Sequence, residues 1–150
     1  MSQPHQILAG SQTIVVIDWP SPEVPAALAA AGLTVIVKGG PGPADYTAWE
    51  YTGGEITRRP LGGPPGHADL VYVHRPLAEL AAVIALARSL GAAAVWRQSG
   101  RNRAGERDPA GCWLPPGESE AGRALAAAAG LGYVDDLCIT DVARSFGNSG

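Results

Sequence analysis

Three times along this chain, a stretch rich in helix-forming residues runs into a glycine that is followed directly by a short apolar run. Glycine just past the end of a helix supplies the left-handed backbone conformation that stops the helix. A short apolar, β-rich run after it is typical of a buried strand. The three units are residues 23–31, Gly32 and 33–37; residues 77–90, Gly91 and 92–96; and residues 118–129, Gly130 and 131–134.

Two further apolar runs, residues 13–17 and 70–73, complete an alternating pattern of strands and helices. Strands that alternate with helices form a parallel sheet with helices packed on its faces. We therefore predict an α/β fold with a Rossmann-like, doubly wound, mostly parallel sheet of about five strands and helices on both faces.

Two stretches interrupt the alternation. Residues 39–67 begin and end in Gly/Pro clusters, and between them residues 46–52, Gly53-Gly54 and residues 55–59 favour a hairpin with a two-residue turn. Residues 99–117 are polar and rich in Gly, Pro and Arg. A segment of this length is a lid over a site or a disordered surface loop, and the sequence leaves both open.

Length and composition indicate one domain. With 150 residues and 46% hydrophobic content, we expect a single domain over residues 1–150 with flexible tails at 1–11 and 145–150. The formal net charge of −3 and the scattered basic residues predict no nucleic-acid partner. Glu79 and Arg88 interrupt the longest apolar stretch and no secretory signal is visible, so we expect no membrane partner and a cytoplasmic location. We expect a monomer or a homodimer.

The two cysteines, Cys112 and Cys138, belong to neither a CxxC pair nor a Cys/His metal spacing. We interpret them as buried or inert thiols and expect no metal cofactor. The sequence also shows no nucleophile with a base at a meaningful spacing. These observations favour a protein that is not an enzyme.

Two of the predicted strands end on polar residues that could hold a ligand. One run ends in His74-Arg75-Pro76 and the next ends in Arg97-Gln98. Ligands of open parallel sheets bind beyond the carboxyl ends of the strands, so we expect Arg75 and Gln98 to lie together at the edge of a crevice. The guanidinium of Arg75 suits a phosphate or carboxylate. The alternative is a surface ion pair with an acid such as Asp69 or Glu79.

The turn after the first predicted strand lacks the glycines of a pyrophosphate loop. Residues 18–25 hold three prolines, which donate no N–H, and two acids, which repel phosphate. Ser21-Pro22-Glu23 suits the start of a helix, with Ser21 as the N-cap. The alternative for Asp18 and Ser21 is a contact with another ligand group, such as a ribose hydroxyl.

Three motifs follow one another along the chain. They are Asp69-Leu70-Val71-Tyr72-Val73-His74-Arg75-Pro76; Gly91-Ala92 leading to Val95-Trp96-Arg97-Gln98-Ser99-Gly100; and Gly130-Leu131-Gly132-Tyr133-Val134-Asp135-Asp136-Leu137-Cys138-Ile139. In the order and spacing of these motifs, the chain resembles the small CoA-binding domain family, whose fold is similar to the CoA-binding domain of succinyl-CoA synthetase. Relatives carry a Gly-x-Ser type loop where this chain has Asp18-Trp19-Pro20-Ser21, and the segment 99–117 is longer here.

The resemblance implies a domain that binds the nucleotide part of CoA along the carboxyl edge of its sheet. It implies that Arg75 and Pro76 border the adenosine or pantetheine, and that Gln98 and Gly100 line the crevice near the first turn. It implies a phosphate contact for Lys38, which precedes Gly39. We therefore predict a non-catalytic domain that binds CoA or another adenine nucleotide, with these residues and Gly39, Asp18 and Ser21 as binding candidates.

A second hypothesis is that the chain keeps the Rossmann-like fold, has lost nucleotide binding, and acts as an interaction or scaffold module. Trp19, Trp49 and Trp113 would then be exposed partner contacts in loops. Trp96 is expected in the core because its neighbours read as a buried strand. Asp135 and Asp136 are expected to be solvated turn residues.

Overall fold

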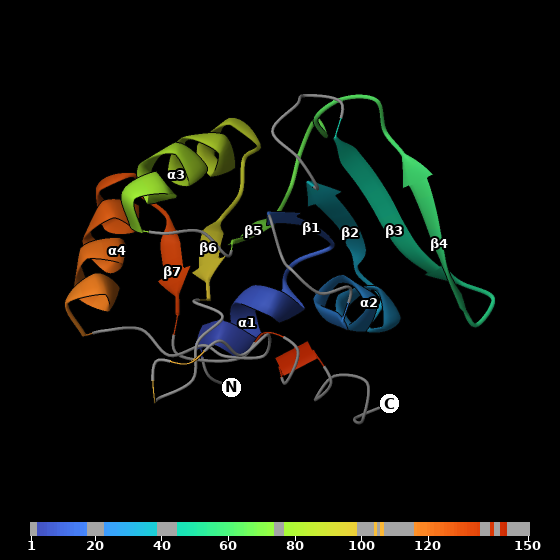
Figure 1. Ribbon diagram of the computed structural model, residues 1–150, viewed down its shortest axis with the longest axis horizontal. Coiled ribbons are helices and arrows are strands. Elements are labelled where there is room, and N and C mark those ends of the chain that lie inside the picture. Colours follow the sequence, from blue (N-terminus) through green and yellow to red (C-terminus); the bar gives the residue numbers. More distant parts are fainter. Residues whose placement is uncertain are drawn as a thin grey trace.

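The computed structural model describes residues 3–17, 23–38, 45–73, 77–98, 104, 106, 116–135, 139, 142 and 143. These residues form a seven-stranded sheet in the order β4-β3-β2-β1-β5-β6-β7, with helices on both faces (Figure 1). The predicted α/β, Rossmann-like architecture is confirmed.

Five adjacent strands of this sheet are parallel. The chain builds outward from β1 to β2, then returns to the other side of β1 with β5 and continues outward through β6 to β7. The five strands expected from the sequence are therefore confirmed. Their bounds are β1 (Thr13–Ile17), β2 (Thr34–Lys38), β5 (Leu70–Val73), β6 (Ala94–Arg97) and β7 (Gly132–Val134).

The predicted hairpin is also confirmed, and it joins the sheet. Strand β3 (Tyr46–Thr52) pairs antiparallel with β2, and β4 (Glu55–Pro60) pairs antiparallel with β3. Between them, Gly53 and Gly54 have φ angles of 62° and 84°, which only glycine adopts readily and which suit the type I′ turn of a two-residue hairpin. The sheet thus has seven strands because the hairpin extends the parallel part at β2.

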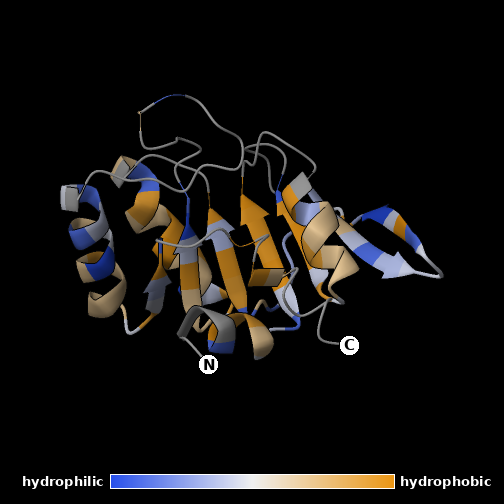
Figure 2. Cartoon of the chain, turned by 90° about the horizontal axis from the view of Figure 1, so that it is seen from below, coloured by the Kyte–Doolittle hydropathy of each residue, from blue (hydrophilic) through white to orange (hydrophobic). Residues whose placement is uncertain are grey.

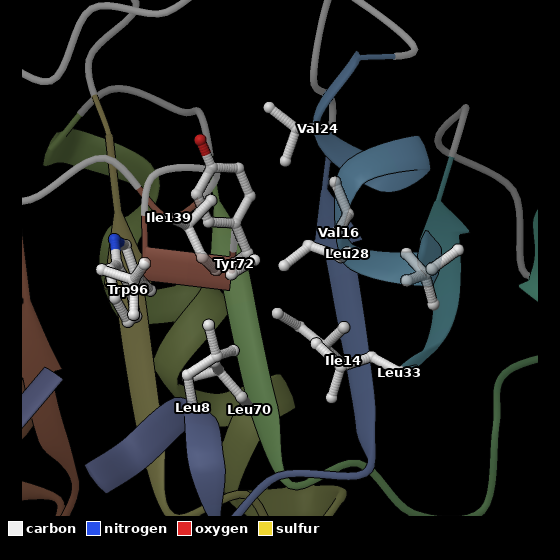
Figure 3. Close-up of a cluster of buried hydrophobic side chains, with 14 of the residues drawn as sticks. Leu8, Ile14, Val16, Val24, Leu28, Leu33, Leu70, Tyr72, Trp96 and Ile139 are labelled. Atoms are coloured by element: carbon white, nitrogen blue, oxygen red, sulfur yellow. The ribbon is translucent and has the colours of Figure 1, made fainter. Parts of the chain in front are cut away.

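The helices divide between the two faces according to the alternation of each strand. Ile14, Val16, Leu70, Tyr72 and Trp96 form one buried cluster with residues of α1 (Gln3–Ala9) and α2 (Glu23–Ala30), shown in Figure 3. The intervening strand residues form a second cluster with α3 (Leu80–Ser89), which follows the short 3-10 helix η1 (Leu77–Glu79), and with α4 (Pro116–Ala128). The central strands β1 and β5 are mostly hydrophobic because both faces of the sheet are covered there, whereas β4 is mostly polar and exposed (Figure 2). Trp96 is fully buried, as predicted.

The three glycines predicted to end helices all do so in the same way. Gly32, Gly91 and Gly130 have φ angles of 98°, 74° and 76°. After each glycine, the next backbone N–H donates to a carbonyl five residues back, from Leu33 to Leu28, from Ala92 to Ala87 and from Leu131 to Ala126, at 2.9–3.2 Å. A left-handed residue makes this bond possible, so these glycines set the points where the chain turns into the sheet.

Two expectations about exposure differ from the structure. Residues 1–11 were expected to be a flexible tail, but residues 3–9 form α1, and Leu8 is only 1% exposed in the core. Trp49 was expected in a loop, but it lies in β3, is 8% exposed, and packs with the residues of the α2 face. Both differences arise from contacts with distant segments, which short sequence windows do not contain. The expected tail at 145–150, Trp19, Trp113 and both cysteines lie outside the described residues.

Candidate functional site

Among the parallel strands of the described sheet, the strand order reverses between β1 and β5. β1 and β5 are adjacent and parallel, yet β1 leads to β2 on one side while β5 leads to β6 on the other. α2 follows β1 on one face, and α3 follows β5 on the opposite face. The connections therefore diverge, and in open α/β sheets the ligand crevice lies outside the carboxyl ends of two such strands.

Six of the eight predicted binding residues fall on segments next to this edge that lie outside the described residues. Asp18 and Ser21 follow β1 in the sequence, and Arg75 and Pro76 follow β5. Gly39 and Gly100 follow β2 and β6. All six thus belong by chain order to the connections that follow these strands, and their binding roles stay predictions.

Lys38 is one of the two described candidates. It is the last residue of β2, and in the sheet register it pairs with Ile17, the last residue of β1. Its side chain is half-buried, and its Nζ lies 6.0 Å from the centre of the Tyr46 ring. Burial raises the pKa of Tyr46, which keeps that neighbouring ring a neutral phenol. Lys38 therefore places a positive charge at the carboxyl edge beside β1.

Gln98, the other described candidate, follows β6 directly and has a buried side chain, 1% exposed. Its backbone N–H donates to the Val73 carbonyl at 3.0 Å, and its Oε1 accepts the Ile139 N–H at 3.0 Å. The Nε2 group is buried and makes no hydrogen bond with the described residues. Gln98 thus ties the end of β5 and residue 139 together, and it retains an amide donor at the carboxyl edge.

Lys38 and Gln98 are not neighbours. Their strands are separated by β1 and β5, which at the usual strand spacing places them about 14 Å apart across the sheet. Their side chains also fall on opposite faces, because Lys38 lies over Tyr46 of the α3 face, whereas Gln98 holds Ile139 of the α2 face. A ligand that contacts both residues must be extended and must cross the edge between β1 and β5.

A buried polar cluster at the ends of β6 and β7 is not among the predicted residues. Arg97 is 2% exposed, and its Nη2 donates to Oε1 of Glu118 in the first turns of α4 at 2.9 Å. Trp96 pairs with Val134, so Arg97 and Asp135 follow side by side on the α4 face. Asp135 is 3% exposed, and its Oδ2 is buried without a hydrogen bond to the described part of the chain. The expectation of a solvated Asp135 is wrong, and Asp136 lies outside the described residues.

Tyr133 extends this cluster toward α4. Burial raises the pKa of its phenol to about 12, the Asp135 carboxylate acts in the same direction, and Arg97 opposes them. Among the described residues the hydroxyl is buried without a hydrogen bond of ordinary geometry, and it lies against Gly122 of α4, where a side chain would overlap it. The strand alternation was the available signal for this cluster, because Arg97 falls on the same buried face as Val95.

Comparison with protein families adds to this geometry. The family model described as "CoA binding domain" matches residues 18–142. The chain belongs to the CoA-binding domain family. The match covers the segments that follow β1, β2, β5 and β6 in the sequence. The family resemblance noted from the motifs is therefore confirmed.

Solved structures support the fold of this CoA-binding domain. The structure titled "cell-free ID.343 from Thermus thermophilus" is 22% identical, with a TM-score of 0.53 and 94% of each chain covered. Prb, the PH1109 protein redesigned for binding, is 18% identical, with a TM-score of 0.58 and coverage of 95% of this chain and 89% of that one. At these identities the likeness establishes the architecture. A comparison with curated proteins finds no match.

The acid that begins the family motif, Asp69, works at the opposite edge of the sheet. Its Oδ2 accepts the N–H groups of Gln12 and Thr13, both at 2.9 Å, and its Oδ1 lies 3.0 Å from His67 Nε2. The hydrogen bond from Thr13 is the main cause of a lowered Asp69 pKa, and those from Gln12 and His67 lower it further. Asp69 thus joins the start of β1 to the start of β5 at the amino edge, and Val73 of the same motif ends β5 at the carboxyl edge.

The described residues contain no group of three or more His, Cys, Asp or Glu side chains that could hold a metal ion. Among the same residues, no helix has the length and apolar character needed to cross a membrane.

Proposed function

We propose that this protein binds CoA or another adenine nucleotide at the carboxyl edge of its sheet, across the divergence of β1 and β5. The observation that carries the proposal is the family match, which spans every connection bordering that edge. The strand order supports it, because such a divergence is where open α/β sheets take their ligands. The candidate residues supply charge and hydrogen bonds rather than a nucleophile and base, so the proposed role is binding without a chemical step.

The composition of the first turn decides how phosphate would be held. Residues 18–25 contain no glycine and three prolines, which removes backbone donors from the usual phosphate loop. The proposal therefore assigns the phosphate contacts to the cationic side chains of Lys38 and Arg75. Asp18 and Ser21 are left to bind neutral groups such as ribose hydroxyls.

The separation of Lys38 and Gln98 favours the longer ligand. In this proposal the adenosine diphosphate part of the ligand lies at Lys38 and Arg75, and the pantetheine arm of CoA extends toward β6 and Gln98. The proposal therefore predicts that CoA binds more tightly than ADP, because only CoA has an extended arm beyond its phosphates.

Isothermal titration calorimetry with CoA, ADP, ATP and NAD tests this function. Lys38→Ala and Arg75→Ala are each expected to weaken CoA binding by about tenfold or more, because each removes a hydrogen bond to a charged group. Arg123→Ala, which removes an exposed charge from α4, is the matched control and should leave the affinity unchanged. Gln98→Met should weaken CoA and leave ADP unaffected. If none of the four ligands binds, the proposal is overturned.

One observation weighs against the scaffold alternative. Trp49, which that hypothesis uses as an exposed contact, is buried in β3, and the Arg58 guanidinium carbon lies 4.1 Å from the centre of its ring. Its indole therefore stabilises the hairpin and is covered by the protein's own side chains.

A further inference from the structure

The β3–β4 hairpin ends the sheet in an exposed edge strand. β4 is the last strand in the order, and five of its six residues are exposed, with Ile56 intermediate. The hairpin projects beyond the helices that cover the rest of the sheet (Figures 1 and 2). An edge of this kind offers backbone N–H and C=O groups to a further strand.

The register defines which backbone groups β4 presents outward. Thr52 and Glu55 flank the two-residue turn and form a hydrogen-bonded pair, and the Leu61 N–H donates to the Tyr46 carbonyl at 2.9 Å in the same register. Residues 55, 57, 59 and 61 therefore face β3 with their backbone groups. Ile56 and Arg58 direct their N–H and C=O groups away from the sheet, where no strand of the described residues lies.

We infer that β4 pairs antiparallel with β4 of a second copy of this chain, about a two-fold axis at Thr57. In that register Ile56 lies opposite Arg58 of the other copy. The N–H and C=O groups of Ile56 and Arg58 in each copy then form hydrogen bonds with the other copy. Glu55 lies opposite Arg59 of the other copy, which makes two symmetric ion pairs. The two hairpins become one continuous sheet across the dimer.

Charge complementarity selects this register and this partner. A shift of the axis by one residue toward the C-terminus places Arg58 opposite Arg58 of the other copy, and like charges directly opposite one another are unfavourable. Glu55, Thr57 and Arg59 share one face of β4 with Glu50 of β3, because residues two apart in a strand share a face and Glu50 pairs with Thr57. Arg59 already lies 3.4 Å from Glu50, and both side chains are exposed. Arg59 can thus hold Glu50 of its own copy and Glu55 of the other.

The first test of the dimer is the molecular mass in solution, measured at increasing protein concentration. Sedimentation velocity or light scattering on the full chain should show the mass rising from one copy to two as the concentration increases toward about 1 mM, the weak end of specific association. A mass of one copy throughout that range overturns the inference.

Charge reversal then tests the register. Glu55→Arg and Arg59→Glu each place like charges opposite one another at two symmetric positions, so each variant alone should dimerise at least about tenfold more weakly. Mixing the two variants should restore a heterodimer. The arginine introduced at position 55 then faces the glutamate introduced at position 59, and the unchanged Arg59 of one copy faces the unchanged Glu55 of the other. The double variant E55R/R59E should restore the homodimer.

Circular dichroism confirms that each of these exposed substitutions leaves the fold intact. A dimer insensitive to both single changes, or no recovery on mixing, would show that the interface is elsewhere.

Hydrogen exchange separates strand pairing from contact through side chains alone. The Ile56 and Arg58 amides should exchange more slowly at high protein concentration than at low, whereas the Thr57 and Arg59 amides, which bond to β3, should be protected at both. Equal exchange of Ile56 and Arg58 at both concentrations excludes pairing through β4. Neither readout requires CoA, so failure of the dimer is distinguishable from failure of ligand binding.

Discussion

Asp69 and Asp135 are both acids next to strands of the same sheet, but they lie in opposite environments. Asp69 sits at the amino edge, partly exposed, with its carboxylate holding two backbone N–H groups and facing His67. Asp135 lies at the carboxyl end of β7, 3% exposed, beside Arg97 under α4, with one oxygen unsatisfied among the described residues. Both acids belong to motifs that carry the family resemblance, yet Asp69 joins two strands at the amino edge, whereas Asp135 is buried beside Arg97, which forms an ion pair with Glu118.

The largest expected effect comes from breaking the buried cluster. Arg97→Met removes the buried cation that pairs with Glu118 and lies beside Asp135, which should cost about 3–5 kcal/mol of unfolding free energy. Urea unfolding followed by circular dichroism measures it. Adding Asp135→Asn should recover part of the loss, because one of the two acids beside the lost cation is then neutral. If the double variant is no more stable than the single one, Asp135 does not depend on Arg97.

Alkaline pH should lower the free energy of unfolding through the buried Tyr133 of the same cluster. The folded-state pKa of about 12 lies above the ordinary value of 10.0, so the stabilisation is fully present below pH 10 and is lost as the pH rises through the folded value. Two pH units correspond to about 2–3 kcal/mol. Unfolding free energies measured across this range should fall for the natural chain and fall less steeply for Tyr133→Phe. Equal slopes would show that Tyr133 titrates as an ordinary exposed phenol.

The close approach of α4 to β7 predicts a smaller effect. Alanine normally stabilises a helix relative to glycine by about 1 kcal/mol. At Gly122, however, the new Cβ would lie 2.7 Å from Cζ of Tyr133 and overlap its hydroxyl, so Gly122→Ala should destabilise by about 1–3 kcal/mol. Gly117→Ala, in the first turn of the same helix with open space around the new Cβ, is the matched control and should be neutral or stabilising. Thermal unfolding distinguishes the two, and a stabilising Gly122→Ala would contradict the packing at Tyr133.

The smallest effect is expected at the amino edge. Asp69→Asn keeps one acceptor oxygen and removes the charge, so it should cost about 1 kcal/mol at neutral pH. The folded-state pKa of Asp69 is lowered, so its stabilisation is present above the ordinary carboxyl value of about 3.9 and is lost as the pH falls through the folded value. The stability difference between the natural chain and the variant should therefore shrink in acid. A difference that stays constant down to about pH 2 would assign the effect to something other than the Asp69 charge.

The sequence predicted more of the fold than of the polar sites. The five parallel strands, the hairpin and the three glycine helix ends all follow from patterns a few residues long, and all are confirmed. The predictions that Asp135 is solvated and that Trp49 is exposed were wrong, because the burial of these residues depends on α4 and on the α2 face, which are distant in the sequence. Lys38 and Gln98 were both expected at the carboxyl edge, and the structure places them there, on opposite faces.

The sequence by itself determined the order of the strands and helices and the family, because local periodicity, glycine punctuation and motif spacing are properties of the chain alone. Only the tertiary structure decided which polar groups are buried together. In the tertiary structure Asp69 joins β1 to β5 at the amino edge, and Arg97 lies with Asp135 and Tyr133 beneath α4. β4 is the unpaired edge strand of the described sheet. These outcomes depend on distances between segments remote in sequence, since the free energy of a charge or a backbone group is fixed by what surrounds it.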